Sequence, residues 1–220
     1  MAGLISGVEL ETVRAGRERV LAEIAQAARK AGRDPGEVEL LAAVKYIALE
    51  ELGVLAEAGL DILGENRAQE LEAKAEAHPG FRWHFIGQLQ SRKVKQILPY
   101  TELIHSVASD SALRQLEKHG TPETEVLVEV NVAGDEGKAG IAPADLPAFL
   151  ERAPVRVGGL MTMPPFSEDP EDSRRHFAAL RELASAHGLA RLSMGTSQDF
   201  AVAVEEGATL VRVGSRLYGA

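Results

Sequence analysis

Residues 191–215 read RLSMGTSQDFAVAVEEGATLVRVGS and contain one complete strand–helix–strand unit. The apolar run at 191–194 predicts a strand, 198–206 predicts a helix, and the β-branched run at 209–213 predicts a second strand. Strands joined through a helix pair in parallel, because a parallel connection needs a crossover long enough to return to the same end of the sheet. The unit therefore predicts a parallel sheet covered by helices, which is an α/β fold.

The same alternation of strand and helix runs along the rest of the chain. A long helix is expected first, at 9–31, with Gly32 just past its end. Further strands are expected at 38–45, 61–64, 83–87, 103–107, 125–132 and 155–161, and further helices at 49–58, 67–77, 91–98, 109–118, 144–151 and 171–187. This number of strands predicts closure into a single (β/α)8 TIM-like barrel. An open, doubly wound sheet is the alternative that the pattern alone leaves open.

Length and continuity bear on the number of domains. The chain has 220 residues, which is ample for one core and tight for two domains. No linker, low-complexity stretch or obvious sequence repeat interrupts it. We therefore expect residues 1–220 to form one domain, with no room for an appended second one.

Composition narrows the class of protein. Acidic residues outnumber basic residues by 33 to 24, for a net charge of −9, and an acidic chain without a basic stripe binds nucleic acid poorly. There is no cysteine, which excludes disulfides and thiolate sites and fits a reducing compartment. No apolar run is long enough for a membrane span and 1–9 does not resemble a secretory signal, so we expect a cytoplasmic protein. Nothing in the pattern suggests a large obligate interface, and we expect a monomer.

The working residues of a parallel barrel gather where its strands end, and the first expected strand ends in Lys45, within LLAAVKY. A lysine there points toward the barrel mouth or its interior. Because desolvation favours the neutral amine, such a lysine is a candidate nucleophile toward a carbonyl group. The alternative is a strand-end lysine that extends into water and has no chemical role.

Short turns rich in glycine and hydroxyl groups follow the last two strands, SMGTS at 193–197 and GS at 214–215. Barrels often bind phosphate with the loops after strands seven and eight and a helix N-terminus. Ser197 is expected to cap the helix that follows, with free backbone amides left for an anion. The alternative is that Ser197 is only a cap and Gly214 only a turn residue.

Arg212 lies inside the last expected strand, between two valines. An arginine there must face a partner or a polar cavity, because it does not give up its charge. A reactive lysine, a phosphate site and an interior arginine together describe a phosphorylated aldehyde held as an imine, and pyridoxal phosphate fits that description. A class I aldolase also combines a barrel lysine with a phosphate site, so these residues alone leave both open.

Several ordered blocks of the sequence resemble the pyridoxal phosphate homeostasis proteins, the YggS/PROSC family. The blocks are AAVKY at 42–46, GENRAQE at 64–70, WHFIGQLQSRK at 83–93, IHSV at 104–107, VEVNVAGDEGKAGI at 128–141, GLMTMPP at 159–165, LSMGTSQDF at 192–200 and VRVGSRLYG at 211–219. They extend over nearly the whole chain, which makes a chance match very improbable.

This resemblance implies a fold similar to the barrel domain of alanine racemase, without that enzyme's second domain. It implies that Lys45 holds pyridoxal 5′-phosphate as a Schiff base and that Arg212 faces the pyridine nitrogen. The remaining cofactor-binding residues that it implies are Thr196, Ser197, Gly214 and Ser215 at the phosphate, with Ser193 and Met194 nearby, and Asn66, His84 and Met161 along the pocket.

Four positions depart from the pattern typical of the family. Arg92 stands where asparagine is common, Thr196 where methionine is common, and Gln198 where aspartate is common. Ser215 replaces threonine but keeps the hydroxyl group, so phosphate binding should survive. Thr196 is expected to act through its backbone amide, which any residue except proline supplies.

Whether the protein is an enzyme depends on groups beyond the cofactor. A racemase needs two positioned acid–base groups, and an arginine at the ring nitrogen weakens the cofactor as an electron sink. Tyr46 and Tyr218 are the closest substitutes for a missing base, and neither has an assignable partner in the sequence. We therefore expect a protein that stores, shields or delivers pyridoxal phosphate, with apo enzymes that use this cofactor as candidate recipients. A racemase or lyase of low activity is the alternative.

Overall fold

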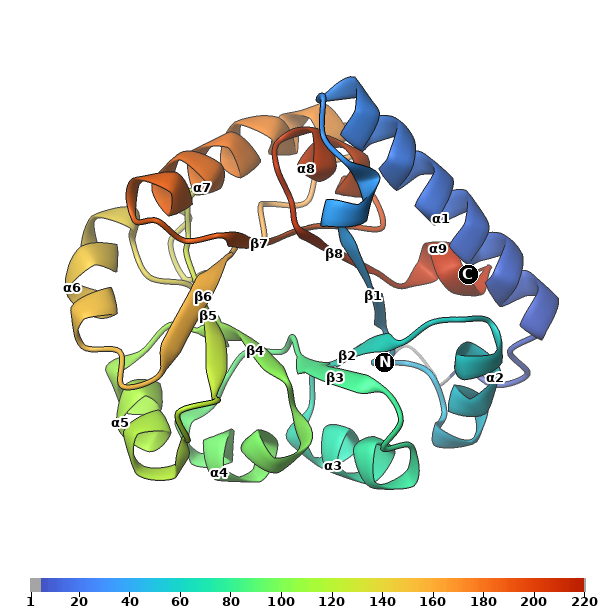
Figure 1. The fold of residues 1–220 in the computed structure, drawn as a ribbon. Coiled ribbons are helices and arrows are strands. Elements are labelled where there is room, and N and C mark those ends of the chain that lie inside the picture. Colours follow the sequence, from blue (N-terminus) through green and yellow to red (C-terminus); the bar gives the residue numbers. More distant parts are fainter. Residues whose placement is uncertain (1–4, 220) are drawn as a thin grey trace.

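Eight parallel strands close into a barrel in chain order in the computed structural model, which describes residues 5–219 (Figure 1). The strands are β1 (Glu39–Ala43), β2 (Ile62–Glu65), β3 (Arg82–Phe85), β4 (Leu103–Val107), β5 (Glu125–Glu129), β6 (Arg156–Met161), β7 (Arg191–Thr196) and β8 (Leu210–Val213). The last strand pairs with the first, with Leu40 opposite Val211 and Ala42 opposite Val213. This closure confirms the expected barrel and excludes the open sheet.

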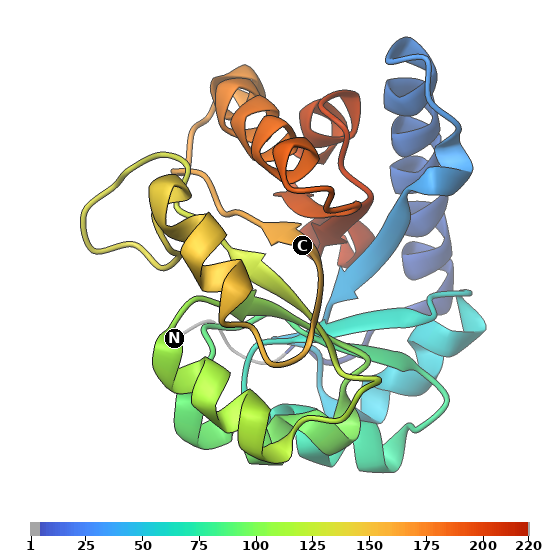
Figure 2. The same cartoon turned by 60° about the vertical axis from the view of Figure 1, so that its left-hand side comes forward.

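Helices surround the barrel and connect its strands (Figures 1 and 2). They are α1 (Leu10–Lys30), α2 (Leu52–Glu57), α3 (Ala68–Ala77), α4 (Val94–Ile97), α5 (Asp110–His119), α6 (Leu146–Glu151), α7 (Arg174–Ala186), α8 (Phe200–Glu205) and α9 (Ser215–Tyr218). The short helix α9 was not expected from the sequence; it lies against α1, where Arg216 forms an ion pair with Glu23. None of the described helices is long and apolar enough to cross a membrane.

Several element boundaries differ from the sequence expectation by a few residues, and two of these differences have clear local reasons. The strand expected at 125–132 ends at Glu129, because the chain beyond it pairs with the returning loop: Asn131 N donates to the Ile141 carbonyl, and Val130 forms an isolated bridge with Ile141. The helix expected from 198 begins only at Phe200, because Asp199 occupies its N-cap position. Both differences shorten an element at the end of the barrel where the loops are long.

The barrel has an outer and an inner core. The outer core fills the space between strands and helices, as expected for parallel strands that are buried on both faces. Inside the barrel the apolar side chains form two separate clusters, Leu41 with Ile62 and Leu210, and Leu103 with Leu127 and Met161. The interior is therefore a packed core, and the polar groups between these clusters need partners of their own.

Charged side chains close the barrel at the end where the strands start, which we call its lower end. Arg82 contacts Glu39 at 2.9 Å and Glu102 at 2.7 Å, while Arg191 contacts Glu39 at 3.4 Å and Glu125 at 3.8 Å. We call these five residues the lower ion-pair network. Every one of its charges has an opposite charge within 4 Å.

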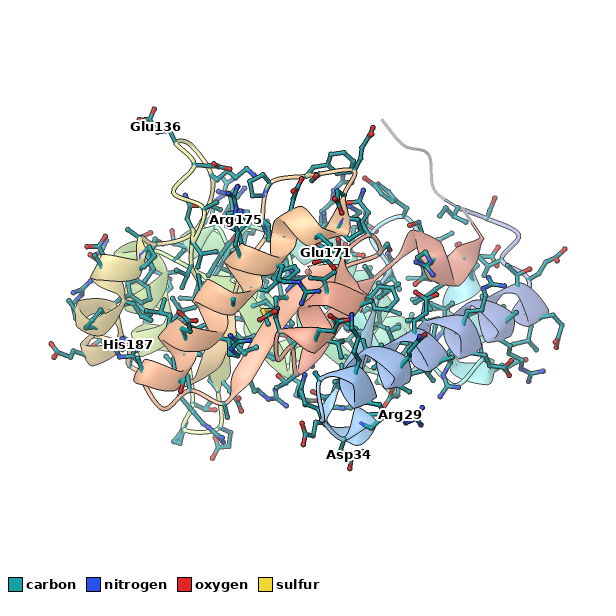
Figure 3. The ribbon with its side chains drawn as sticks, turned by 90° about the horizontal axis from the view of Figure 1, so that it is seen from above. Arg29, Asp34, Glu136, Glu171, Arg175 and His187 are labelled. Atoms are coloured by element: carbon teal, nitrogen blue, oxygen red, sulfur yellow. The ribbon has the colours of Figure 1, made fainter. Side chains whose placement is uncertain are left out.

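Figure 3 shows the molecule with its two rims at opposite edges. Arg175, at the start of α7, and Glu171, in the turn before it, lie toward the rim from which the loop carrying Glu136 projects. His187, Arg29 and Asp34 lie toward the other rim. Since helices run antiparallel to the strands they connect, the first rim is the one at which the strands end.

Candidate cofactor-binding site

A cavity of about 670 Å³ opens at the carboxyl ends of the strands. Its volume is in the range that holds a cofactor or small ligand. The residues that line it are Ile5, Ala43, Lys45, Tyr46, Ile47, Asn66, Ile86, Gly87, Gln88, Met163, Thr196, Ser197, Gln198, Arg212, Gly214, Ser215 and Tyr218. Most of them come from β1, β7 and β8 or from the segments that follow β1, β2, β3, β7 and β8, while Met163 follows β6 and Ile5 precedes α1. The cavity therefore spans the closure of the barrel.

Lys45 stands in the turn that follows β1. Its Nζ lies 4.9 Å from the centre of the Tyr46 ring, and its side chain is exposed at the mouth rather than buried in the interior. The turn itself is fixed, because the carbonyl of Val44 accepts hydrogen bonds from Ile47 N at 3.0 Å and from Lys74 Nζ at 2.8 Å. The amine therefore reaches the cavity from a rigid base and is accessible to a ligand.

A buried ion pair supports both Lys45 and Asn66. Glu65 and Lys74 are almost completely buried and lie 2.7 Å apart. The second oxygen of Glu65 accepts the Asn66 amide at 2.7 Å, and Lys74 also holds Val44. The pair thus ties the ends of β1 and β2 together. Sequence reasoning missed it, since a lysine on an amphipathic helix reads as a solvated residue.

Asn66 presents an acceptor to the cavity. Its Oδ1 is buried and has no hydrogen-bond partner among residues 5–219. Gly87 packs so closely on Asn66 that a Cβ atom there would lie 2.1 Å from the Asn66 carbonyl oxygen. The close packing of Gly87 therefore fixes the position of the Asn66 backbone. A buried acceptor without a donor is rare and costly, which is the pattern of a group that binds a ligand.

The loop after β7 differs in detail from the sequence expectation. Ser197 does not cap α8; its Oγ accepts a hydrogen bond from Gly214 N at 3.1 Å and so joins the loops after β7 and β8. The amide of Thr196 is already bonded to Asp199 Oδ1 at 2.7 Å. The expected roles of Ser197 as a helix cap and of the Thr196 amide as a free donor are therefore both wrong.

Other backbone donors remain free in these two loops. Within the described range 5–219, no acceptor bonds to the amides of Ser197, Gln198, Ser215 or Arg216. Gly195 makes the loop possible, because its φ of +90° is in the region that favours glycine. Convergent amides without acceptors make a local site for an anion on an otherwise acidic protein.

Arg212 lies at the inner wall of the cavity and is only 6% exposed. It donates to Ser193 Oγ, to the Thr162 carbonyl at 3.0 Å and to Met163 Sδ at 2.9 Å. Burial lowers its pKa to about 10, against the opposing effect of Asp199 and Glu129. The guanidinium therefore stays charged near neutral pH, and its remaining N–H groups are available to the cavity.

Not all predicted residues line the cavity. It contains Lys45, Asn66, Thr196, Ser197, Arg212, Gly214 and Ser215. The others lie away from its wall: Met194 in the outer core, Met161 in an inner cluster, and Ser193 and His84 in the barrel interior. Sequence reasoning missed Gln88, Met163 and Gln198 as lining residues, although GQLQ, GLMTM and TSQ each stand in a block that it had singled out.

The tyrosines near Lys45 have no groups that would make them strong bases. Tyr218 lines the cavity and donates to the Ala43 carbonyl at 3.4 Å, and burial raises its pKa above the usual range. Tyr46 lies under the Lys45 ammonium with its ring partly exposed. No histidine lies on the cavity wall among the described residues.

A second hollow, of about 630 Å³, lies beside the start of α7. It is lined by Phe166, Glu171, Arg174 and Arg175 among others, and Figure 3 shows Glu171 and Arg175 at this outer edge. Arg174 is engaged by Glu171, Glu205 and Glu206. The charge of Arg174 is therefore paired with those of three carboxylates.

Comparison with known proteins gives a consistent result. The family model described as the alanine racemase N-terminal domain matches residues 17–220. A pyridoxal phosphate homeostasis protein of Aquifex aeolicus is 42% identical over 216 residues, covering 91% of this chain and 95% of that protein.

Solved structures agree with this match. PipY of Synechococcus elongatus, determined with pyridoxal phosphate bound, is 32% identical, with a TM-score of 0.74 over 89% of this chain and 100% of PipY. Alanine racemase of Corynebacterium glutamicum has a TM-score of 0.69 at 17% identity, covering 96% of this chain but 61% of the enzyme. The second likeness concerns the fold alone.

Proposed function

This chain belongs to the family of pyridoxal phosphate homeostasis proteins, whose barrel is that of the alanine racemase N-terminal domain, and from that premise we propose that it binds pyridoxal 5′-phosphate. Lys45 holds the cofactor as a Schiff base, and the protein takes part in keeping the cofactor available inside the cell. Free pyridoxal phosphate is a reactive aldehyde, so a protein that shields it has a chemical rationale.

The observation that carries the proposal is the set of groups that line one cavity. An accessible lysine amine, a buried arginine and a set of unpartnered backbone amides face the same space. The amides after β7 and β8 suit the phosphate, Lys45 suits the aldehyde, and Arg212 suits the ring nitrogen. The unpartnered Oδ1 of Asn66 suits a donor on the ligand, such as the ring hydroxyl group.

The same cavity favours binding over turnover. When bound, the cofactor supplies an electron sink, and Arg212 limits it because a charged guanidinium does not protonate the ring nitrogen. Tyr218, with its raised pKa, keeps its proton near neutral pH and so cannot accept one from a substrate. We therefore propose a carrier without significant catalysis, acting in the cytoplasm and passing the cofactor to apo enzymes that depend on it.

Borohydride trapping tests the proposal directly. The purified protein is incubated with pyridoxal phosphate, its absorption spectrum is recorded before and after reduction, and the labelled peptide is mapped. We expect a visible band that reduction removes and a pyridoxyl group on Lys45. Lys45→Ala should lose the label completely, whereas Lys93→Ala, a matched lysine outside the cavity, should keep it. A protein that stays colourless and unlabelled would overturn the proposal.

Deuterium exchange distinguishes the carrier from a racemase or lyase. The loaded protein is incubated with amino acids in D₂O, and α-hydrogen exchange is followed by NMR. A carrier that does not turn over amino acids leaves the α-hydrogen in place. Exchange that disappears in Lys45→Ala would instead support the catalytic alternative.

A further inference from the structure

A chain of buried polar side chains runs through the barrel interior and ends at Arg212. Arg212 Nη1 donates to Ser193 Oγ, Ser193 Oγ lies 2.8 Å from His105 Nδ1, and His105 Nε2 lies 3.0 Å from His84 Nδ1. Ser193, His105 and His84 each have an exposed fraction of 0%. They come from β7, β4 and β3, so the chain crosses the barrel beneath the cavity.

The proposed function assigns no role to His84, His105 or Ser193. We propose that they are positioning residues: they form a hydrogen-bond chain of fixed direction that orients Arg212 toward the ring nitrogen of the cofactor. This inference rests on the proposed function, since it concerns the atom that Arg212 meets. It goes beyond that function in assigning a task to three residues that do not line the cavity.

The direction of the chain follows from Ser193. Arginine only donates, so Ser193 Oγ must accept from Arg212. Among residues 5–219, the remaining partner of that hydroxyl group is His105 Nδ1, which therefore accepts the Ser193 proton. His105 then carries its hydrogen on Nε2 and donates it to His84 Nδ1, and His84 carries its own hydrogen on Nε2.

The surroundings of the two rings keep them neutral. His84 Nε2 is buried and has no partner in the described part of the chain. Burial lowers the pKa of His84 to about 4 and lowers that of His105 well below its usual value. The charges that face these rings are those of Arg82, Arg191, Glu102 and Arg212, and the carboxylate of Glu102 is already paired with Arg82. Both rings are therefore neutral, as the chain requires.

The consequence for Arg212 is a fixed orientation. Ser193 always presents a lone pair to Nη1, while Thr162 and Met163 take the hydrogens of Nη2. The Nε–H group has no acceptor within residues 5–219, so the guanidinium keeps a donor for the cavity. A guanidinium held in this way can donate a hydrogen bond to the ring nitrogen without losing side-chain conformational entropy on binding.

The first experiment reads the tautomers in the protein without cofactor. Nitrogen-15 NMR at pH 7 distinguishes protonated from unprotonated ring nitrogens, with His84→Gln and His105→Gln variants to assign the signals. We expect both rings to be neutral with the hydrogen on Nε2. A hydrogen on Nδ1 of either ring, or a protonated ring, would overturn the direction of the chain. This readout does not depend on cofactor binding.

The second experiment separates the ring nitrogen from the rest of the ligand. Dissociation constants are measured for pyridoxal phosphate and for 1-deazapyridoxal phosphate, in which a C–H group replaces that nitrogen. Ser193→Ala should weaken binding of pyridoxal phosphate by about tenfold and of the deaza analogue by less than about twofold. Thr162→Val is the matched control, because it also removes one buried hydroxyl group, bonded to Val130, and leaves the carbonyl that Arg212 uses.

The outcomes distinguish this inference from the proposed function. Equal weakening of both ligands in Ser193→Ala would overturn the positioning role while leaving cofactor binding intact. Binding of neither ligand to the wild-type protein would instead overturn the proposed function. A loss of selectivity in Thr162→Val as large as that in Ser193→Ala would show that any nearby buried hydroxyl group acts in this way, and the specific chain would be rejected.

Discussion

The two ends of the barrel differ in how far their charged and polar groups are paired. At the strand starts, the lower ion-pair network places every charge within 4 Å of an opposite one, although the buried Oε1 of Glu125 has no hydrogen-bond partner within residues 5–219. At the strand ends, Lys45 has no ion-pair partner within residues 5–219, the Asn66 acceptor is unsatisfied, and several backbone amides have no acceptor. The difference identifies the strand ends as the side where a ligand completes the structure. Groups paired with one another stabilise the fold, whereas groups left unpaired are available for binding.

The buried pair of Glu65 and Lys74 is an exception to this difference, because it lies at the strand ends and both of its charges are paired. Lys74→Met should destabilise the protein by about 3–5 kcal/mol, since it leaves the Glu65 carboxylate buried without a counter-charge. Urea denaturation measures the change. This is the largest effect that we expect from any variant here, and it arises from a support of the site rather than from its lining.

Two further variants make the Lys74 measurement specific. Lys95→Met changes an exposed lysine and should alter the free energy of unfolding by less than about 0.5 kcal/mol. Glu65→Gln combined with Lys74→Met should recover part of the loss, because no charge is then buried. A Lys74→Met protein as stable as Lys95→Met would show that the pair does not support the mouth.

The neutral histidines between the two ends predict a loss of stability in acid. The folded-state pKa of His84, about 4, lies below the ordinary value of 6.5, so the unfolded chain binds the proton first as the pH falls. Stability from this residue is complete above pH 6.5 and is lost between pH 6.5 and 4. At pH 5 the loss should be about 2 kcal/mol.

The measurement compares the free energy of unfolding of the parent and of His84→Gln from pH 7 to 5. Glu129, whose pKa burial raises, acts in the opposite direction, but it is present in both proteins and cancels. The parent should lose more stability than the variant on acidification. Parallel curves would mean that His84 binds its proton equally well in both states.

The fold could be predicted from the sequence because its signals are local. Each strand is a short apolar run between turn residues, and β4 has the bounds that its run LIHSV predicts. The end of β5 could not be read in the same way, because Val130 pairs with Ile141 across a loop. That pairing depends on how the loop folds, so it produces no periodic pattern in the sequence.

Those parts of the site could be predicted in which a single residue stands out from its sequence neighbours. Lys45 and Arg212 could be singled out because a charged residue in or at the end of an apolar strand needs an explanation. The contact between His105 and Ser193 could not, since 88 residues separate them and each fits an ordinary strand. The bond from the Thr196 amide to Asp199 is local, and the spacing of a turn followed by an aspartate could have indicated it.

A variant of the lower ion-pair network tests the other side of the comparison. Arg82→Met should destabilise the protein by about 1 kcal/mol, because its two ion pairs are partly exposed and screened by solvent. Its dissociation constant for pyridoxal phosphate should not change. The difference in unfolding free energy should shrink in concentrated salt, where such pairs are weakened. Weaker cofactor binding in this variant would break the division between a structural end and a binding end.

The smallest effect that we expect concerns the bond between the two loops at the mouth. Ser197→Ala removes the acceptor of the Gly214 amide and one hydroxyl donor from the anion site. Binding of pyridoxal phosphate should weaken by about threefold, or about 0.7 kcal/mol, since one hydroxyl donor is lost while the backbone amides of the two loops remain. Binding of pyridoxal, which lacks the phosphate, should be unchanged, and the free energy of unfolding should fall by no more than about 1 kcal/mol, since the hydrogen bond to Gly214 is lost. If both ligands weaken equally, Ser197 acts on the ring or on Lys45, and the loops after β7 and β8 are not the phosphate site.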